Sequence, residues 1–388
     1  MTTTVNNEHK NLKVPNLRFK EFQGEWEKSK LSDLCTFFSG GTPSSSNKDF
    51  YGGDIAFIRS GELHANSTEL FISQDGYDNS SAKMVEIGDL LLAMYGATSG
   101  DIAISKIKGA INQAILCIRT NQNKKFIESV WNKHVSKILR KYLQGGQGNL
   151  SADIVKGISF SFPTLEEQER IANLISLLDE RIATQNKIID KLQSLIKGIV
   201  DCTILSKEKN AIVGDVCSIS EQIRAEANID DIITVRLHGN GVCKSSAENL
   251  QLGATQYYRR RARQLIYGKQ NFHNGAIGIV PISLDNGITS KDIPSFDIDE
   301  MKCNSVYLLA QLQSPQYYKP AEALTTGTGS KRLKEDTFLK MPIVLPNKRE
   351  QDNIAVLIHR ASMNLDHAKR LLELLSIQKQ FLLRQIFI

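Results

Sequence analysis

A run of basic and aromatic residues has the strongest chemical character in this sequence. Residues 257–263 read Tyr-Tyr-Arg-Arg-Arg-Ala-Arg, so four arginines and two tyrosines occupy seven positions. Guanidinium groups bind phosphates and the O6 and N7 acceptors of guanine, and aromatic rings stack on bases. Arginine stems also cover apolar surface on solvated faces, which is the alternative interpretation. The candidate nucleic-acid contacts in this run are Tyr257, Tyr258, Arg259, Arg260, Arg261 and Arg263.

Further polar candidates lie in loops rich in glycine and hydroxyl groups. Gly327-Thr-Gly-Ser330 precedes Lys331 and Arg332, which suits a phosphate because backbone N–H groups and two cations come together. Lys269 is the remaining candidate in this half of the chain. In the first half the loop Gly40–Ser46 is rich in turn residues. The candidates there are Thr42, Ser44, Ser45, Arg59, Ser60, Tyr95, Thr98 and Gln147.

Motifs for catalysis are missing from the sequence. It contains no GxxxxGK[ST], GxGxxG, HExxH or GxSxG pattern, and no Asn/Asp-Pro-Pro-aromatic tetrapeptide of the kind that amino-methylating enzymes use. His64, His238 and His273 have no carboxylate partner visible in the sequence, and the six cysteines are far apart without metal-ligand spacing. We therefore expect neither a catalytic residue nor a bound metal or cofactor, and interpret the thiols as reduced.

Two long helical segments must position these candidates, and they repeat each other. Sliding residues 163–205 by 183 positions superposes Pro163 on Pro346, Glu167-Gln168 on Glu350-Gln351, and Ile171-Ala172 on Ile354-Ala355. Thr164 and Asn347 each stand three residues before a glutamate, which is a capping-box arrangement at the start of a helix. An internal repeat at constant offset predicts two tandem units.

Apolar residues recur every seven positions along both segments, as in a coiled coil. In the first segment two such series interleave, and Gln185 in the seam is the counterpart of Ala368 in the second. We expect the two helices to pack on each other; the alternative is that each is an amphipathic helix on its own domain. The seam and partner-interface candidates are Gln168, Ile171, Ile175, Leu178, Ile182, Ile189, Gln351, Ile354, Ile358, Leu365 and Leu372.

The globular segments repeat more loosely than the helices. Leu31–Cys35 is echoed by Val213–Cys217 at an offset of 182, Gly100–Ile104 by Gly275–Ile279 at 175, and Tyr95-Gly96 by Tyr267-Gly268 at 172. Leu333 and Asp336 fall on Leu150 and Asp153 at 183, whereas Gly40-Gly-Thr-Pro has no recognisable counterpart. We predict an α+β chain with pseudo-two-fold symmetry, in which two mixed α/β domains (1–162 and 206–345) are separated by two long helices (163–205 and 346–388) packed as an antiparallel coiled coil.

Composition agrees with a globular DNA-binding protein without demanding one. The 388 residues are 41% hydrophobic and 23% charged, with a net charge of +6. No run of eighteen apolar residues and no secretory signal occurs, so we expect a cytoplasmic protein that does not contact a membrane.

The tandem plan, the two Pro/Glu-Gln/Ile-Ala helix starts, Leu17-Arg-Phe19 with Gly24-Glu-Trp26, and Tyr95-Gly96 to Gly100 resemble the specificity subunit of type I restriction-modification systems. The resemblance covers essentially the whole chain. It implies that each globular unit is a target-recognition domain for one half of a bipartite site in double-stranded DNA. It also implies that the helices bind two modification (methyltransferase) subunits, to which restriction subunits (ATP-dependent translocase and endonuclease) are added.

The resemblance further implies that this chain is not catalytic. Its partners would use S-adenosylmethionine for adenine methylation, and ATP with Mg²⁺ for cleavage. Helices of about 40 residues span roughly 60 Å, enough to serve two half-sites with an unread spacer between them. Two alternatives remain open, namely a coiled-coil adaptor that binds only proteins and a free-standing DNA methyltransferase or nuclease.

Overall fold

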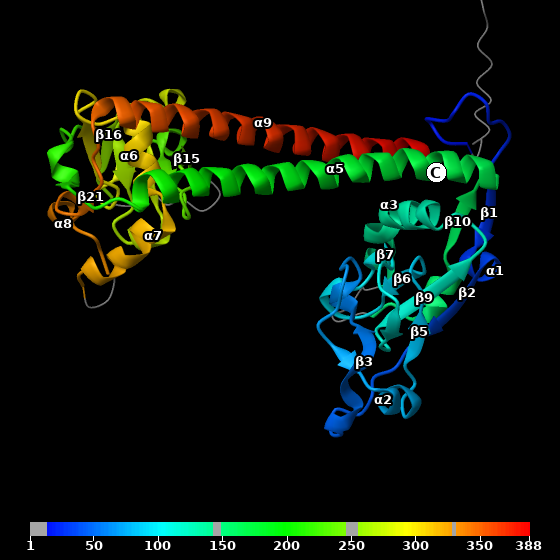
Figure 1. Ribbon diagram of the computed structural model, residues 1–388. Coiled ribbons are helices and arrows are strands. Elements are labelled where there is room, and N and C mark those ends of the chain that lie inside the picture. The colour runs from blue at the N-terminus through cyan, green and yellow to red at the C-terminus, as the bar shows by residue number, and fades with distance from the viewer. Residues whose placement is uncertain (1–13, 143–148, 246–254, 328–330) are drawn as a thin grey trace, which may run out of the picture. The chain divides into compact units, whose positions relative to one another are not determined.

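The computed structural model describes residues 14–142, 149–245, 255–327 and 331–388, which belong to two compact units (Figure 1). One unit comprises Met1–Thr184 and Leu372–Ile388, and the other comprises Gln185–Leu371. Each unit holds one mixed α/β domain and part of both long helices, α5 (Leu165–Val200) and α9 (Lys348–Ile386). The predicted fold class, two mixed domains with two long helices packed together, is confirmed.

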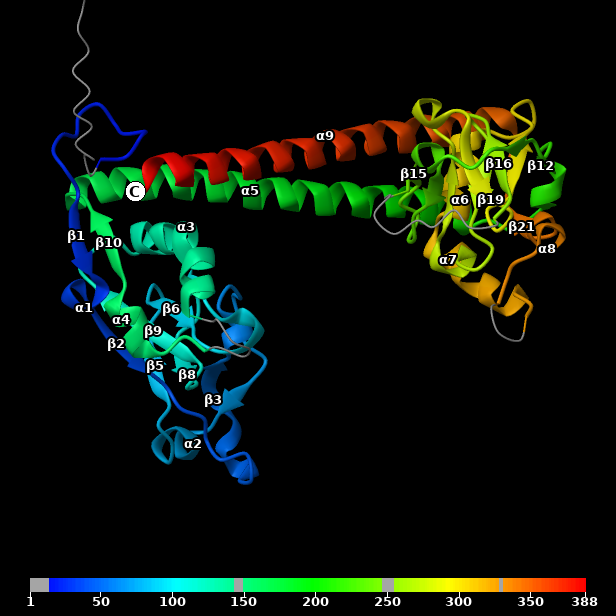
Figure 2. The same ribbon diagram turned by 180° about the vertical axis from the view of Figure 1, so that it is seen from behind.

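The first domain is built on two four-stranded sheets (Figure 2). The antiparallel sheet has the order β2-β9-β6-β7, and the other has the order β4-β3-β8-β5 with β3 and β8 parallel. A separate antiparallel pair, β1 with β10, leads into and out of the domain. The strands are β1 Glu27–Lys30, β2 Cys35–Ser39, β3 Tyr51–Ile58, β4 Phe71–Ile72, β5 Lys83–Val85, β6 Leu90–Ala93, β7 Ile102–Ile104, β8 Gly109–Ile111, β9 Ile115–Thr120 and β10 Ser159–Phe162, and the helices are α1 Leu31–Leu34, α2 Gln74–Asp78, α3 Lys124–Tyr142 and α4 Ala152–Gly157.

The second domain repeats this plan in a reduced form. Its main sheet has the order β12-β20-β17-β18, and smaller sheets are formed by β13-β16-β19, by β14-β15 and by β11-β21. The strands are β11 Ala211–Ile212, β12 Cys217–Ile219, β13 Arg224–Ala225, β14 Ile233–Val235, β15 Val242–Lys244, β16 Tyr257–Arg260, β17 Leu265–Tyr267, β18 Ile277–Ile279, β19 Gly287–Ser290, β20 Ser295–Ile298 and β21 Pro342–Ile343, and the helices are α6 Ser305–Leu312, α7 Pro315–Tyr318 and α8 Glu335–Leu339.

Strand registers establish which residues of the two domains correspond. Leu90 faces Ile104 in the first domain and Leu265 faces Ile279 in the second, so both positions differ by 175. The sequence echo at this offset is therefore structural. The echo of Tyr95 in Tyr267 at 172 is wrong by three residues, because Tyr267 ends the buried strand β17 whereas Tyr95 follows β6 and is 36% exposed.

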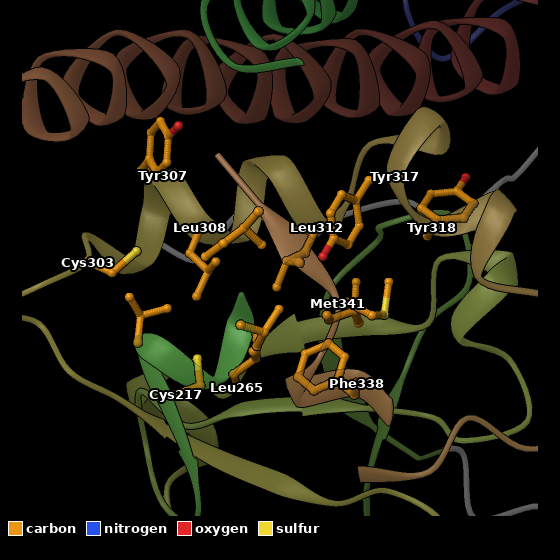
Figure 3. Close-up of a cluster of buried hydrophobic side chains, with 14 of the residues drawn as sticks. Cys217, Leu265, Cys303, Tyr307, Leu308, Leu312, Tyr317, Tyr318, Phe338 and Met341 are labelled. Atoms are coloured by element: carbon orange, nitrogen blue, oxygen red, sulfur yellow. The ribbon is translucent and has the colours of Figure 1, made fainter. Parts of the chain in front are cut away.

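Helix α6 closes the core of the second domain (Figure 3). Leu308 and Leu312 point from α6 toward Leu265 of the main sheet and Phe338 of α8, and all four side chains are fully buried. Tyr307 donates a hydrogen bond from its hydroxyl to the carbonyl of Val344 (3.1 Å), so the one polar atom of this ring is satisfied. Helix α6 is thereby held against the segment that leads into α9.

The first turn of each long helix is capped as the sequence predicts, but only by half of the expected motif. Thr164 Oγ1 accepts from Glu167 N (3.4 Å), and Asn347 Oδ1 accepts from Glu350 N (3.0 Å). The glutamates bond elsewhere: Glu167 accepts two hydrogen bonds from Arg18 (2.8 and 2.7 Å) and one from Trp26 Nε1 (3.3 Å). Glu350 instead pairs with Lys207 on the surface. The first glutamate therefore attaches the N-terminal segment rather than closing a capping box.

One buried glutamine in each long helix joins that helix to its domain. Gln168 Oε1 accepts from Asn123 N (3.1 Å), and Gln351 Oε1 accepts from Asn304 N (2.9 Å). Asn123 and Asn304 are the residues just before α3 and α6, and their side chains accept from the first turns of those helices. Each glutamine Nε2 also donates to the carbonyl of the proline that precedes its own helix (3.0 and 2.8 Å). Both glutamines are 1% exposed, so these amides bond to protein rather than to water.

Helices α5 and α9 run antiparallel where they contact each other. Asp179 pairs with Lys379 (2.5 Å) in the first unit, and Gln185 Nε2 donates to the carbonyl of Ala368 (2.9 Å) in the second. The residue number therefore rises along one helix as it falls along the other, as predicted. A buried polar residue in an apolar seam specifies register. The seam residues that are buried are Ile171, Ile175, Leu178, Ile189, Ile354, Ile358, Ala361, Ala368 and Leu375.

The long helices pack on each other in some turns and on their own globular domains in others, so both interpretations from the sequence hold. Ile171 and Ile175 belong to the core of the first domain, and Ile354 and Ile358 belong to the core of the second. The first turns of each helix thus lie on a globular domain, whereas the Gln185 turn lies on the other helix. In the described parts of the chain, no helix is both long and apolar enough to cross a membrane.

The last turn of α9 completes the core of the first domain. Phe387 is 2% exposed, and its ring lies 5.2 Å from that of Phe126 and 6.5 Å from that of Trp26. Leu17 N donates to the carbonyl of Gln385 (3.0 Å). The first domain therefore depends on a segment from the far end of the chain.

We predict that Gln168→Ala and Gln351→Ala lower stability by similar amounts. Either change leaves a buried backbone N–H without its acceptor, at a cost of about 1–3 kcal/mol. Melting temperatures of the purified chain measure the effect, and Gln378→Ala on the exposed face of α9 is the matched control. Equal melting temperatures for all three variants would contradict this role.

Asp179 gives a prediction about pH. Burial alone would raise the pKa of Asp179, but hydrogen bonds from Lys125 and Lys379 outweigh it and hold the pKa below its ordinary value. The carboxylate therefore stabilises the fold above about pH 4, and this contribution is lost as pH falls through the folded-state pKa. We expect Asp179→Asn to cost about 1–2 kcal/mol at pH 7 and progressively less in acid. A melting-temperature difference that stays constant from neutral to strongly acidic pH would refute this.

Candidate nucleic-acid interface

An edge of the first domain gathers most of the polar candidates of that half. Strands β3 and β8 are parallel, with Ile58 opposite Ile111, so the residues that follow them lie at the same edge. Arg59 and Ser60 follow β3, and Gln113 lies in the turn that follows β8. Arg59 is exposed and pairs with Glu62 (2.8 Å), which holds the pKa of that carboxyl below its usual range. This edge carries a cation, a hydroxyl and an amide.

The loop after β2 packs tightly against the same turn. A side chain on Gly40 would place its Cβ 1.7 Å from the carbonyl oxygen of Ile111, so only glycine allows this approach. Thr42 Oγ1 then donates to Gln113 Oε1 (2.6 Å), and the Tyr51 hydroxyl holds the loop by donating to the carbonyl of Pro43 (2.8 Å). Gln113 was not among the sequence candidates; the available signal is a polar turn directly after an apolar strand.

A third segment reaches the edge through the main sheet. Met94 N donates to the carbonyl of Ala114 (2.8 Å), which places Tyr95 beside the Gln113 turn. Thr98 lies in the short helical turn that follows. Ser44 and Ser45 are exposed in the Thr42 loop, and Gln147 lies outside the described residues. The structure thus brings Thr42, Arg59, Ser60 and Tyr95 to the edge that holds this turn, and Thr98 lies three residues beyond Tyr95.

The arginine run of the second domain does not form one exposed cluster. Arg260 is fully buried, and its guanidinium donates to Thr289 Oγ1 (2.7 Å), Ser295 Oγ (3.0 Å) and the carbonyl of Ile293 (2.9 Å). Burial lowers its pKa to about 10. The prediction that Arg260 contacts DNA is corrected, because its donors face the protein interior. Tyr257 is also buried, at 6% exposure.

The neighbouring arginines face solvent. Arg259 is exposed in the middle of β16, and Arg261 and Arg263 are exposed just after it. Arg263 has a left-handed backbone (φ 70°), and it corresponds to Gly88 of the first domain (φ 91°). Arg263 N donates to the carbonyl of Val280, just after β18, and Gly88 N donates to the carbonyl of Ser105, just after β7, both at 2.8 Å. The chain thus keeps the same turn in both domains and places an arginine on it in the second.

The other cations lie at the opposite end of β16. This strand is antiparallel to β19, with Tyr257 opposite Ser290 and Arg260 opposite Gly287. Arg332 pairs with Asp292 (3.3 Å) close to the Ser290 end, and Lys331 approaches Glu322 (3.8 Å). Lys269 is 9% exposed and paired with Glu335 (2.7 Å), so its predicted DNA contact is corrected in favour of a structural ion pair.

His64 has an acidic neighbour that the sequence did not reveal. Its Nε2 lies 2.9 Å from Asp101 Oδ1, and the His64 side chain is exposed whereas that of Asp101 is partly exposed. Within the described residues, no group of three His, Cys, Asp or Glu side chains is placed to hold a metal ion.

We predict opposite outcomes for two adjacent arginines. Arg260→Ala removes a buried side chain and leaves Thr289 Oγ1 and Ser295 Oγ without the donor that they share, which should destabilise the protein by about 2–4 kcal/mol. Arg259→Ala should change stability by less than about 0.5 kcal/mol because its side chain is exposed. Melting temperatures of the two variants decide the matter, and a stable Arg260→Ala protein would refute the structural role.

Comparison with known proteins agrees with the tandem architecture. The family model for the type I restriction modification DNA specificity domain matches residues 23–194. The MjaIX specificity subunit of Methanocaldococcus jannaschii is 28% identical over 183 residues, which cover 43% of this chain and 42% of that protein. The MjaVIII specificity subunit of the same organism is 21% identical over 383 residues, which cover 87% of each.

A solved structure has the same fold. The S subunit of a type I restriction-modification system from M. genitalium superposes with a TM-score of 0.65 at 12% identity, covering 97% of this chain and 99% of that one. The fold, the matched domain and the full-length alignment with a specificity subunit agree, and they describe a chain that supplies specificity rather than catalysis. Residues 23–194 of this chain match the type I restriction modification DNA specificity domain, and the chain is similar over most of its length to a DNA specificity subunit of a type I restriction-modification system.

Proposed function

We propose that the chain reads a bipartite site in double-stranded DNA, with one half-site for each globular domain. Residues 1–162 and 206–345 are the two target-recognition domains, and residues 163–205 and 346–388 form the scaffold. The observation that carries this proposal is that the two domains share sheet order and strand register but carry different side chains at corresponding edges. Two readers of different sequences, built on one framework, would have this property.

The proposed DNA contacts are the exposed members of the predicted set. In the first domain the edge around Gln113 supplies hydroxyl, amide, aromatic and cationic groups for base edges and phosphates. In the second domain Lys331 and Arg332 occupy the corresponding end of the outer sheet. The remaining contacts that we propose are Ser44, Ser45, Tyr258, Arg259, Arg261 and Arg263.

The proposed partners are two modification subunits bound through the helix pair, and restriction subunits added to that core. The modification subunits would use S-adenosylmethionine to methylate adenine, and the restriction subunits would use ATP and Mg²⁺. Near-repetition of α5 by α9 supports two equivalent binding positions. Most of the seam is buried, and Ile182, Leu365 and Leu372 are half-buried, so partners would contact mainly the outer faces of the helices. A cytoplasmic location, where chromosomal DNA is accessible, follows from this role.

The test is co-expression of this chain with a candidate modification subunit, followed by mapping of methylated adenines across the host genome. We expect a split motif with a constant gap, present only when this chain is present. The control omits the chain. A stable complex that produces no new methylation would contradict the proposal and favour a protein-binding adaptor.

A triple variant separates the DNA reader from the adaptor. Arg259→Ala, Arg261→Ala and Arg263→Ala together leave the buried Arg260 in place, so the domain should remain folded. A DNA reader should lose methylation while it still binds the modification subunit, because each phosphate contact contributes to affinity. An adaptor would keep its function unchanged.

A further inference from the structure

We propose that residues 112–114 of the first domain and residues 291–294 of the second are equivalent base-reading turns. In these turns Gln113 and Lys291 each read one base pair of a different half-site. The inference rests on the proposed function and adds to it the side chains that set specificity. Lys291 was not a candidate from the sequence, and it stands out only when the two domains are compared in structure.

Backbone hydrogen bonds establish that the turns correspond. Met94 N donates to the carbonyl of Ala114 (2.8 Å) in the first domain, and Lys269 N donates to the carbonyl of Asp292 (2.9 Å) in the second. Met94 and Lys269 follow β6 and β17 at corresponding positions, 175 residues apart. Ala114 and Asp292 therefore occupy one structural position.

A second pair of bonds extends the correspondence to the neighbouring loop. Leu150 N donates to the carbonyl of Met94 (2.9 Å), and Leu333 N donates to the carbonyl of Lys269 (2.9 Å). The donors and acceptors are the same two structural positions in each domain. Arg332, just before Leu333, is thus held beside the turn of its domain, where it pairs with Asp292.

The strands that carry the turns also agree. The first turn connects β8 to β9, and β8 pairs with the antiparallel β5; the second connects β19 to β20, and β19 pairs with the antiparallel β16. Strands β8, β9 and β5 lie together in Figure 2. The residue before Ala114 is Gln113, and the residue before Asp292 is Lys291. These two side chains are exposed at the same place in their domains.

The chemistry at this place differs between the domains. Gln113 presents an amide whose oxygen accepts from Thr42 (2.6 Å), so its orientation is held before any ligand arrives. A glutamine amide pairs with the N6 and N7 atoms of adenine, and its oxygen can accept a second bond because a carbonyl has two lone pairs. Lys291 presents an ammonium group, which pairs with the O6 and N7 acceptors of guanine. We therefore assign an adenine contact to Gln113 and a guanine contact to Lys291.

The experiment compares methylation motifs of variants in complex with the modification subunit. Gln113→Ala should relax one A·T position in one half-site, and Lys291→Ala should relax one G·C position in the other. Discrimination at the affected position should fall about ten- to a hundredfold, as for loss of one bidentate base contact. Lys156→Ala in the first domain and Lys340→Ala in the second are the matched controls, because Lys156 is half-buried and pairs with Asp153 in its own helix, and Lys340 is exposed just after α8.

Thr42→Val provides a test of orientation. It removes the hydroxyl that holds the Gln113 amide but keeps Gln113 itself, so the same base-pair position should relax to a smaller extent. Relaxation at a different position would contradict the assigned role of Thr42.

The outcomes separate this inference from the proposed function. If both variants methylate the unchanged wild-type motif, the inference is overturned and the proposed function stands. The same conclusion follows if both variants relax the same half-site. A wild-type complex without a split motif overturns both. If a variant complex methylates nothing, its specificity is measured instead from its binding affinities for DNA duplexes that carry substitutions in one half-site at a time. Lost discrimination in one half-site with retained discrimination in the other supports the inference, and retained discrimination in both overturns it.

Discussion

The attachment of each globular domain to a long helix depends on one buried amide. Gln168 and Gln351 accept from the residue that caps a domain helix, and they donate back to the residue that precedes their own helix. A single side chain thus joins the start of two helices at a dry junction. An exposed contact of this kind would be worth little, but here an unpaired partner has no water to replace it. The orientation of each reading edge relative to its own helix follows from this junction.

The helices were predictable because their packing constraints are local and repeated. Caps, heptad spacing and the Gln185 position could all be recognised from the sequence, and the offset of 183 connects the junction glutamines as well. The Tyr95 echo was misplaced because similar residue types recur near a strand end, and only hydrogen-bond register shows which of them correspond.

The reading edge was only partly predictable because long-range contacts assemble it. Thr42 and Gln113 are 71 positions apart in the sequence and come into contact only when the loop after β2 packs on the turn after β8. The residue types at positions 112 and 113 do not predict this contact. For the arginine run at 257–263, the sequence predicted more exposed DNA contacts than the structure has. A strand alternates its faces, so consecutive arginines cannot all be exposed, and Arg260 enters the interior where hydroxyl and carbonyl acceptors receive it. The composition of this segment indicated its chemistry but not which of its side chains face solvent and which face the interior.

The packing of Phe387 beside Trp26 and Phe126 has a consequence for the order of folding. A core that includes both early and late residues cannot close while the intervening chain is still being made. The first domain must then remain incomplete on the ribosome, with an aromatic cavity open, until the second domain and α9 have emerged. The core of the first domain can therefore close only when both halves of the chain are present. A chain interrupted between the two halves would expose apolar surface to the quality-control machinery of the cell.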